Sequence, residues 1–265
     1  MKEKTSLILI LKEEIKINEL SLNEYLESKG IIVEGKYFSH NKDFSRRSFE
    51  NQISIMVEVH KLLINCTFNS LNRFGSTIGK QVESFKVQLK RIDRDYRMIF
   101  DKNYKNDVEK LFLSESRKML YQGRQAIDYI YNNGYLDIIK RSMNREEICL
   151  GRADSGNLKK ENGKFKIGLT KGMSYNLVEE DLYKYMKRIQ KKEINIDEEE
   201  FIRIFVHQSH LSQSSINYLN GLCMYPRDFF KVWEHYRDNK KSKSNDEFLE
   251  LLSNSLKYED KSYTN

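Results

Sequence analysis

The sequence is poor in proline and alanine, with one proline at Pro226 and two alanines at Ala126 and Ala153. It is rich in Ile, Lys, Asn and Tyr, a composition that an AT-rich genome favours. It contains no internal repeat and no low-complexity segment. The composition indicates the source of the chain, and the missing repeat excludes a fold built of repeats. Neither feature says anything about mechanism.

Cysteines are few, and long apolar runs are missing. Cys66, Cys149 and Cys223 are odd in number, lie far apart in apolar sequence and form no CxxC pair. They therefore predict buried free thiols in a reducing compartment. The apolar run Leu7–Leu11 is too short for a signal peptide or a membrane span. We therefore expect a soluble, cytoplasmic protein without membrane partners.

A strong excess of one charge is also missing. The formal charge is +7, but 39 acidic residues are mixed among 46 basic ones, so the charges are typical of a solvated surface. Specific binding to nucleic acid is therefore not expected. The 265 residues, 39% of them hydrophobic, suffice for one large or two small globular domains.

Most of the chain has helical periodicity. His60 lies on the apolar stripe of the first long helix, where a lone histidine is more often a packed core residue than a ligand. Residues Gly79–Asp101 have near-heptad spacing, which predicts a helix packed along one face within the chain. The helices are expected over Ser45–Asn65, Gly79–Asp101, Asn106–Tyr131, Tyr135–Met143, Val178–Lys191, Asp197–Gln208, Gln213–Leu222, Pro226–Asp238 and Asp246–Lys257.

Two β-containing stretches interrupt the helical pattern. Residues 1–38 predict β-α-β, with strands at Thr5–Leu11 and Ile31–Phe38 and a helix that a capping box opens at Ser21. In the middle of the chain, Glu147–Lys171 has a short apolar run, a polar loop, an Asn-Gly turn and then alternating apolar residues. The Asn-Gly turn predicts a β hairpin, because both residues accept positive φ. Loops at strand ends commonly carry sites.

The order of helices, loop, hairpin and helices is similar to the large lobe of kinase-fold phosphotransferases. In aminoglycoside and choline kinase-like enzymes, the loop reads HGDxxxxN and a D-x-D or D-x-E follows the next strand. The Asp of the loop is the base, and its Asn and the later Asp bind magnesium. Here the loop reads LGRADSGN over residues 150–157, and Gly151 and Asn157 keep the register.

Two later stretches make the resemblance more specific. EDLYKYMKR at 180–188 and LCMYPRDFFKVWEHY at 222–236 resemble the closing helices of the CotS-type spore coat proteins. Those are kinase-like proteins of endospore-forming bacteria (Firmicutes), related to aminoglycoside phosphotransferases. Glu34-Gly35, followed by the helix with His60, is similar to their hinge and first large-lobe helix. The resemblance is good over residues 140–240, fair over 34–140 and poor before that.

The departures from this pattern predict a pseudoenzyme. The base position holds Arg152, which stays protonated, and the histidine position holds Leu150. The first magnesium position holds Leu169, and Lys171 nearby would repel a metal. Asn157 alone does not hold magnesium against water. We therefore expect no catalytic residue, no metal and no cofactor, and we expect the hairpin to plug the helical core.

The resemblance implies an α+β, mostly α fold: a protein-kinase-like large lobe over residues 39–265 with a central β hairpin. Residues 1–38 would be a much reduced N-terminal small lobe. Before Glu34 they contain one glycine, Gly30, and hence no Gly-rich phosphate loop. Without base, metal ligand and phosphate cover, little remains to stabilise phosphoryl transfer.

The expected function is that of a non-catalytic pseudokinase. It would act by protein–protein contact with other spore coat proteins, in the mother cell cytoplasm or assembled on the coat, without binding nucleotide. One alternative is a divergent small-molecule phosphotransferase that uses other carboxylates, such as Asp154 or Glu179. Another is a basic helical module that binds an anionic polymer, with affinity that falls steeply with salt.

Overall fold

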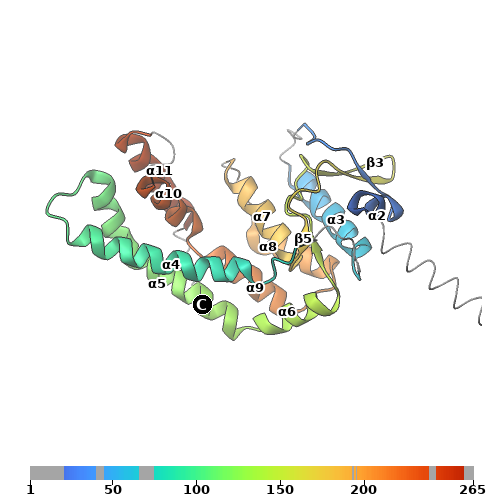
Figure 1. Cartoon of the computed structure of the whole chain (residues 1–265), viewed down its shortest axis with the longest axis horizontal. Coiled ribbons are helices and arrows are strands. Elements are labelled where there is room, and N and C mark those ends of the chain that lie inside the picture. The colour runs from blue at the N-terminus through green and yellow to red at the C-terminus, as the bar shows by residue number, and fades with distance from the viewer. Residues whose placement is uncertain are drawn as a thin grey trace, which may run out of the picture. The chain divides into compact units, whose positions relative to one another are not determined.

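The computed structural model describes residues 21–39, 45–65, 75–192, 194, 196–238 and 243–259. In this part the chain is an α+β protein, mostly helical, with two small sheets (Figure 1). The helices are α2 (Leu22–Ser28), α3 (Arg46–Leu62), α4 (Lys80–Phe100), α5 (Asp107–Asn132), α6 (Tyr135–Asn144), α7 (Glu179–Gln190), α8 (Glu198–Gln208), α9 (Gln213–Met224), α10 (Arg227–Arg237) and α11 (Asn245–Glu259). The strands are β1 (Ile31–Val33), β2 (Ile148–Cys149), β3 (Leu158–Glu161), β4 (Lys164–Ile167) and β5 (Ser174–Tyr175).

The helix ends follow from local capping chemistry. Ser21 and Glu24 form the predicted capping box at the start of α2, and Gly30 follows the helix with a φ of 78°. Asn106 and Glu109 form a second box at α5, and the Asp197 side chain accepts from the Glu200 amide at α8. All nine predicted long helices are thus confirmed to within a few residues at each end.

The predicted hairpin is β3 and β4, which pair antiparallel from Leu158↔Ile167 to Glu161↔Lys164. Its turn residues Asn162 and Gly163 have φ values of 49° and 76°, so both adopt the positive φ that the Asn-Gly pair favours. β1 adds to the free side of β4 in parallel, giving the order β1-β4-β3. A second sheet pairs β2 with β5.

The described chain forms two compact units, and each is considered separately. Unit 1 comprises the described residues up to Ile78 and Leu136–Ile216, and unit 2 comprises Gly79–Tyr135 with the described residues from Asn217 on. In unit 1, α3 packs against β3 and α8, with the rings of Phe49 and Phe201 edge to face at 5.9 Å. Buried apolar side chains of helix and hairpin thus share one core.

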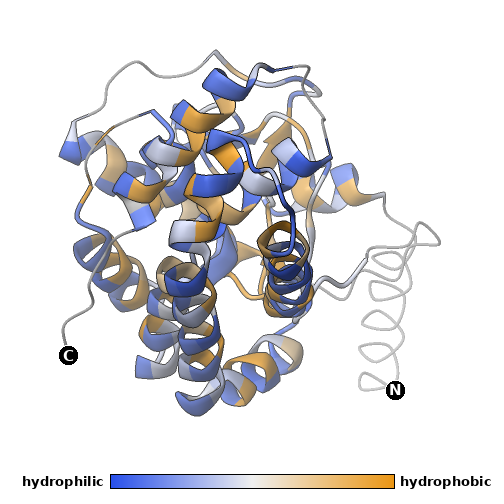
Figure 2. Cartoon of the chain, turned by 90° about the vertical axis from the view of Figure 1, so that its left-hand side faces the viewer, coloured by the Kyte–Doolittle hydropathy of each residue, from blue (hydrophilic) through white to orange (hydrophobic). Residues whose placement is uncertain are grey.

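Unit 2 is a group of amphipathic helices. α4 packs on α5, and α11 packs on α5 and α10. Stacked rings mark its centre, with centroids 3.5 Å apart for Phe112 and Trp233 and 3.7 Å apart for Phe85 and Tyr225. Helices in Figure 2 carry hydrophobic residues on one side and hydrophilic residues on the other, as the helical periodicity predicts.

Two predictions on the pattern of α4 and β1 need correction. The near-heptad spacing predicts that Tyr96 and Ile99 lie on the packed face of α4, but both are only partly buried. Asp95 is instead 5% exposed, and its carboxylate accepts from the indole of Trp233 at 3.0 Å. The strand expected over Ile31–Phe38 ends at Val33, because the chain bends after Glu34. The strand predicted at Thr5–Leu11 lies outside the described residues.

The predicted boundary between residues 38 and 39 does not coincide with a division between the units. β1 is hydrogen-bonded to β4, and the Phe38 amide donates to Gly156 O at 2.9 Å, so these residues belong with the hairpin. A small-lobe remnant over residues 1–38 stays a prediction, because its first twenty residues lie outside the described part.

Cys149 and Cys223 are buried free thiols, as predicted, while Cys66 lies outside the described residues. Burial raises the pKa of the Cys149 thiol well above its usual value, and the carboxylate of Asp181 adds to this effect. Among the described residues, no helix is both long enough and apolar enough to cross a membrane.

Candidate functional site

The candidate site is the loop Leu150–Asn157, which joins β2 to β3 and is held by one carboxylate of α7. Asp181 accepts from the amide of Leu150 at 2.6 Å and from that of Gly151 at 2.9 Å. Hydrogen bonds from N–H groups to an ionised acceptor are among the stronger ones in proteins. The side chain of Asp181 is fully buried, so α7 fixes the start of the loop.

His60 completes this anchor from α3. It is 5% exposed, and its Nε2 lies 2.9 Å from Asp181 Oδ2. Because Asp181 can only accept when ionised, Nε2 carries the proton in this contact. The prediction that His60 is a packed core residue is confirmed. Its role is to orient Asp181, and through it the backbone of the loop.

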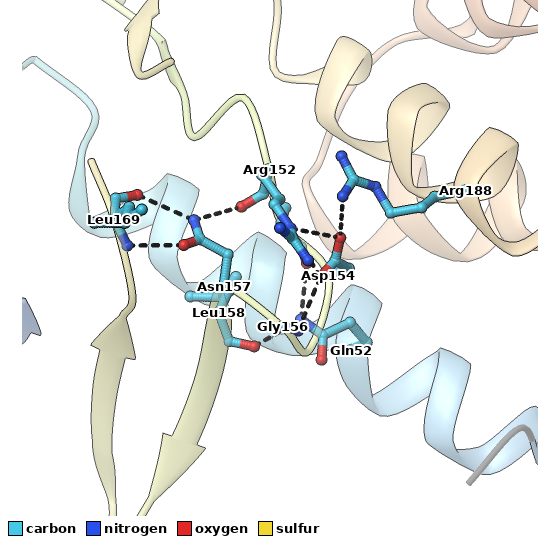
Figure 3. Close-up of polar contacts among 9 residues, drawn as sticks. Gln52, Arg152, Asp154, Gly156, Asn157, Leu158, Leu169 and Arg188 are labelled. Carbon is cyan, nitrogen blue, oxygen red and sulfur yellow. Dashed lines mark hydrogen bonds and ion pairs between the residues drawn. The ribbon is translucent and has the colours of Figure 1, made fainter. Parts of the chain in front are cut away.

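Arg152 and Asp154 form the centre of the loop (Figure 3). Arg152 Nε lies 3.1 and 3.2 Å from the two carboxylate oxygens of Asp154, and Arg188 Nη1 lies 2.9 Å from Oδ2. The Gly156 amide donates to Asp154 Oδ1 at 2.8 Å. The guanidinium of Arg152 also lies over the ring of Tyr37, 4.2 Å from its centroid.

These contacts fix the protonation state of Arg152. Partial burial lowers the pKa of its guanidinium, but the hydrogen bond and charge of Asp154 outweigh this effect and the pKa is raised. Arg152 therefore stays a cation, and the carboxylate of Asp154, whose side chain is 8% exposed, is shared by two guanidinium groups and an amide.

Asn157 links both ends of the candidate site. Its Nδ2 donates to Arg152 O at 2.9 Å and to Leu169 O at 3.1 Å, while its Oδ1 accepts from the Leu169 amide at 2.8 Å (Figure 3). The residue is 1% exposed. The structure thus brings together the three positions that the sequence aligned with base, asparagine and metal ligand.

Backbone packs closely against this linkage. Gly168 follows β4, and a Cβ placed on it would lie 2.6 Å from Lys36 O and 3.2 Å from the Cα of Tyr37. Gly151 has a φ of 73°, and a Cβ there would lie 2.5 Å from Gly172 O. Both contacts are too short for a side chain, so glycine is required where the strand ends meet. Leu169 is partly buried beside them.

Two further side chains complete the support of the loop. Gln52 of α3 is buried, and its amide nitrogen donates to Ala153 O at 2.8 Å and to Leu158 O at 3.0 Å. These bonds fasten the middle of the loop to α3 (Figure 3). The backbone carbonyl oxygens of Ala153 and Leu158 are thereby hydrogen-bonded, as buried polar groups generally are.

A separate charged cluster joins α6, the residue before β2 and the first residue of α7. Arg141 of α6 donates to both oxygens of Glu147, at 3.1 and 2.9 Å, and to both oxygens of Glu179, at 2.8 and 2.9 Å. Both carboxylate side chains are essentially unexposed. Burial raises the pKa of Glu179, but the charge and hydrogen bonds of Arg141 outweigh it, so the pKa lies below its ordinary value.

The polar side chains around the loop are paired with other groups of the protein. Within the described residues, no three His, Cys, Asp or Glu side chains converge in a way that could hold a metal ion. The side-chain oxygen Oδ1 of Asn157 already accepts from the Leu169 amide. The carboxylate oxygens of Asp154 face the guanidinium groups of Arg152 and Arg188. The carboxylates named for a divergent enzyme have different partners: Asp154 pairs with Arg152 and Arg188, and Glu179 pairs with Arg141.

The fold is similar to that of an aminoglycoside phosphotransferase from Alicyclobacillus acidocaldarius subsp. acidocaldarius, known from a crystal structure. The TM-score is 0.65 at 9% sequence identity, and the match covers 86% of this chain and 66% of that enzyme. A match at this identity shows the fold alone. The chain thus has a kinase-like phosphotransferase fold with reduced sheets, and it spans about two thirds of the length of that enzyme.

No model of a known protein family matches the sequence, and no curated protein is significantly similar to it. The prediction of a kinase-like fold related to aminoglycoside phosphotransferases is confirmed. Membership of the CotS-type family, with its spore coat role, stays a prediction.

The sequence did not reveal which residues support the loop. Asp181 and Arg188 both lie in the stretch 180–188 that carries the resemblance, so a signal for them was present. No pattern in the sequence distinguished Gln52, Tyr37 or Arg141 from other polar surface residues, because each acts on a segment distant in the chain.

Proposed function

We propose that this protein is a non-catalytic member of the kinase-like fold, a pseudokinase that acts by binding other proteins. The observation that carries the proposal is the Asn157 linkage, in which Arg152 stands at the base position and the Asn157 side chain is bonded to backbone on both sides. In phosphotransferases of this fold, the residue at the base position accepts a proton, and the residues at the other two positions bind magnesium.

The chemistry of Arg152 supports this proposal. A general base must accept a proton, and a guanidinium with a raised pKa has no free lone pair to do so. Asp154 is the nearest carboxylate, but its oxygens are already engaged by Arg152, Arg188 and the Gly156 amide. Leu169 offers no ligand atom to a metal that would neutralise a phosphate.

The proposed partners are other spore coat proteins. This part of the proposal is supported by the resemblance of residues 180–188 and 222–236 to CotS-type proteins. The same resemblance supports action in the cytoplasm of the mother cell and assembly on the spore coat.

A divergent small-molecule phosphotransferase is the competing function, supported by the similarity of the fold to an aminoglycoside phosphotransferase. It would require Asp154 to leave its contacts with Arg152 and Arg188 during the reaction. A basic module that binds an anionic polymer is the third candidate, supported by the charge of +7.

The deciding experiment measures thermal unfolding with millimolar ATP and magnesium, with magnesium chloride alone as the control. A ligand that binds the folded state raises the melting temperature by mass action, and we expect no change beyond the scatter of replicates. A shift of several degrees would contradict the proposal. Turnover of ATP that Asp154→Ala abolishes would instead establish the divergent enzyme.

A further inference from the structure

Unit 2 contains a groove that neither the candidate site nor the proposed function uses. It lies between α4 and α10 and has a volume of about 650 Å³, within the usual range for ligand sites. We call it the α4–α10 groove. It is lined by Lys80, Gln81, Glu83, Ser84, Phe85, Val87, Gln88 and Arg91 of α4, and by Arg227, Lys231, Glu234 and His235 of α10.

Polar side chains connect the two helices at the groove. Gln88 Nε2 donates to Glu234 Oε2 at 2.7 Å. Further along α4, Asp95 accepts from Trp233 at 3.0 Å and from Arg237 at 2.8 Å. The space beside these bridges is open to a ligand or to solvent.

Cations from both helices border the groove. Lys80 and Arg91 of α4 are exposed, and Arg227 and Lys231 of α10 are partly exposed. On each helix the lining residues recur at spacings of three, four or seven, so they share one helix face. The cations thus face the same space from opposite sides and attract negative charge to it.

The two carboxylates of the lining do not cancel this attraction. Glu83 accepts from the ammonium of Lys86 at 2.9 Å and from the hydroxyl of Tyr131 at 3.1 Å, and these contacts lower its pKa. Glu234 accepts from Gln88. Glu83 is thus paired with a cation, whereas Glu234 keeps its negative charge because the amide of Gln88 is neutral. The lining has four cations, Lys80, Arg91, Arg227 and Lys231, against two carboxylates, so its net charge is positive.

The groove also has an apolar part, which we call its apolar strip, formed by Val87 and Phe85. The side chain of Val87 is 46% exposed, and the lining continues from it to the ring of Phe85, which is almost fully buried. An apolar strip between cationic borders complements an amphipathic helix or extended segment that carries acidic residues beside an apolar row.

We infer that the α4–α10 groove binds an acidic amphipathic segment of a partner protein. This inference rests on the proposed function, because it supplies the surface through which the protein would contact its partner. Nucleic acid fits less well, since a phosphate backbone would gain nothing from the exposed Val87.

The test uses the full chain and a fluorescent helical peptide with leucines at positions i, i+3, i+4 and i+7 and glutamates elsewhere. A peptide of the same composition in scrambled order is the first control, and a single-stranded DNA oligonucleotide is the second. The variant Lys80→Glu/Arg91→Glu reverses two exposed groove charges. Its matched control is Arg94→Glu/Lys257→Glu, which changes the total charge equally at exposed residues of unit 2 that do not line the groove.

We expect the striped peptide to bind at least about tenfold more tightly than the scrambled one, and the groove variant to lose about tenfold in affinity while the control variant loses less than about twofold. Equal binding of both peptides, equal loss in both variants, or tighter binding of the oligonucleotide would overturn the inference. So would a dimer that sedimentation detects and that only the groove variant disrupts. Stabilisation by ATP and magnesium would overturn the proposed function alone, because the groove assay contains no nucleotide.

Discussion

The pKa values of two adjacent buried carboxylates of α7 shift in opposite directions. Glu179 faces Arg141, which outweighs burial and lowers its pKa. Glu180 faces Lys184 at 3.4 Å, but burial is the larger effect and its pKa is raised. The two pKa values shift in opposite directions because Arg141 donates to both oxygens of Glu179 at hydrogen-bond distance, whereas Lys184 lies 3.4 Å from Glu180.

Opposite shifts predict opposite pH dependence. A lowered pKa means that Glu179 stabilises the fold fully above its unfolded pKa, and that this contribution is lost as the pH falls through its folded pKa. Glu179→Gln should therefore cost about 2 kcal/mol at neutral pH and flatten the acid limb of the stability curve below about pH 4.5. Urea unfolding measured between pH 3 and 7 (roughly the range over which carboxyl groups titrate) gives both quantities.

Glu180→Gln is the matched control on the next residue. A raised pKa means that the contribution of Glu180 is fully present below its unfolded pKa and is lost as the pH rises through its folded pKa. Its replacement should leave stability at low pH unchanged and raise it near neutral pH. Equal losses in both variants at neutral pH would contradict the opposite shifts.

At the scale of the element, a glycine in α9 decides how closely two helices approach. A Cβ on Gly221 would overlap Cγ1 of Ile130 in α5 and lie 3.1 Å from its Cδ1. Exposed helix interiors usually gain roughly 0.5–1 kcal/mol when glycine becomes alanine. Here we expect Gly221→Ala to destabilise by about 1–3 kcal/mol, because the core is already filled.

A double-mutant cycle isolates the steric cause of that loss. Ile130→Ala alone leaves a cavity and should cost about 2–5 kcal/mol. With Ile130→Ala present, adding Gly221→Ala should cost little or become favourable, because the overlapping atoms are gone. Additive losses in denaturant unfolding would show that the two residues do not press on each other.

The elements themselves were largely predictable from the sequence, because caps, periodicity and the Asn-Gly turn act within a few residues. What the sequence could not predict depends on distant partners. The parallel pairing of β1 with β4 joins Ile31 to Phe165, and nothing in either strand specifies the other. β5 has two residues and no periodicity, and it is a strand because Ile148, Cys149 and Ser76 pair with it.

The sequence predicted which residues occupy the candidate site, but it did not predict which other residues contact them. Aligning Arg152, Asn157 and Leu169 with known positions placed them in one site, and the hydrogen bonds of Asn157 join all three. The guanidinium of Arg188 and the ring of Tyr37 come from other elements. Their contribution depends on tertiary structure, which a single sequence does not encode in any local pattern.

At the scale of the molecule, both units are discontinuous in sequence. Residues Gly79–Tyr135 leave unit 1 and return to it at α6, and the chain leaves it again within α9. Helix formation is cooperative along a chain, so α9 cannot melt in one unit without shortening in the other. The covalent arrangement therefore favours one unfolding transition over two.

The single tryptophan allows this cooperativity to be measured. Trp233 lies in unit 2, whereas Arg141 lies in unit 1 and neutralises two buried carboxylates. Arg141→Met should cost about 3–5 kcal/mol, because it leaves Glu179 buried without its cation and removes the closer of the two cations of Glu147, the other being Arg145 at 3.5 Å. In urea unfolding we expect tryptophan fluorescence and far-ultraviolet circular dichroism to shift to the same lower midpoint. A shift in circular dichroism with an unchanged fluorescence midpoint would mean that unit 2 folds independently, and that α9 is not stiff enough to couple the units.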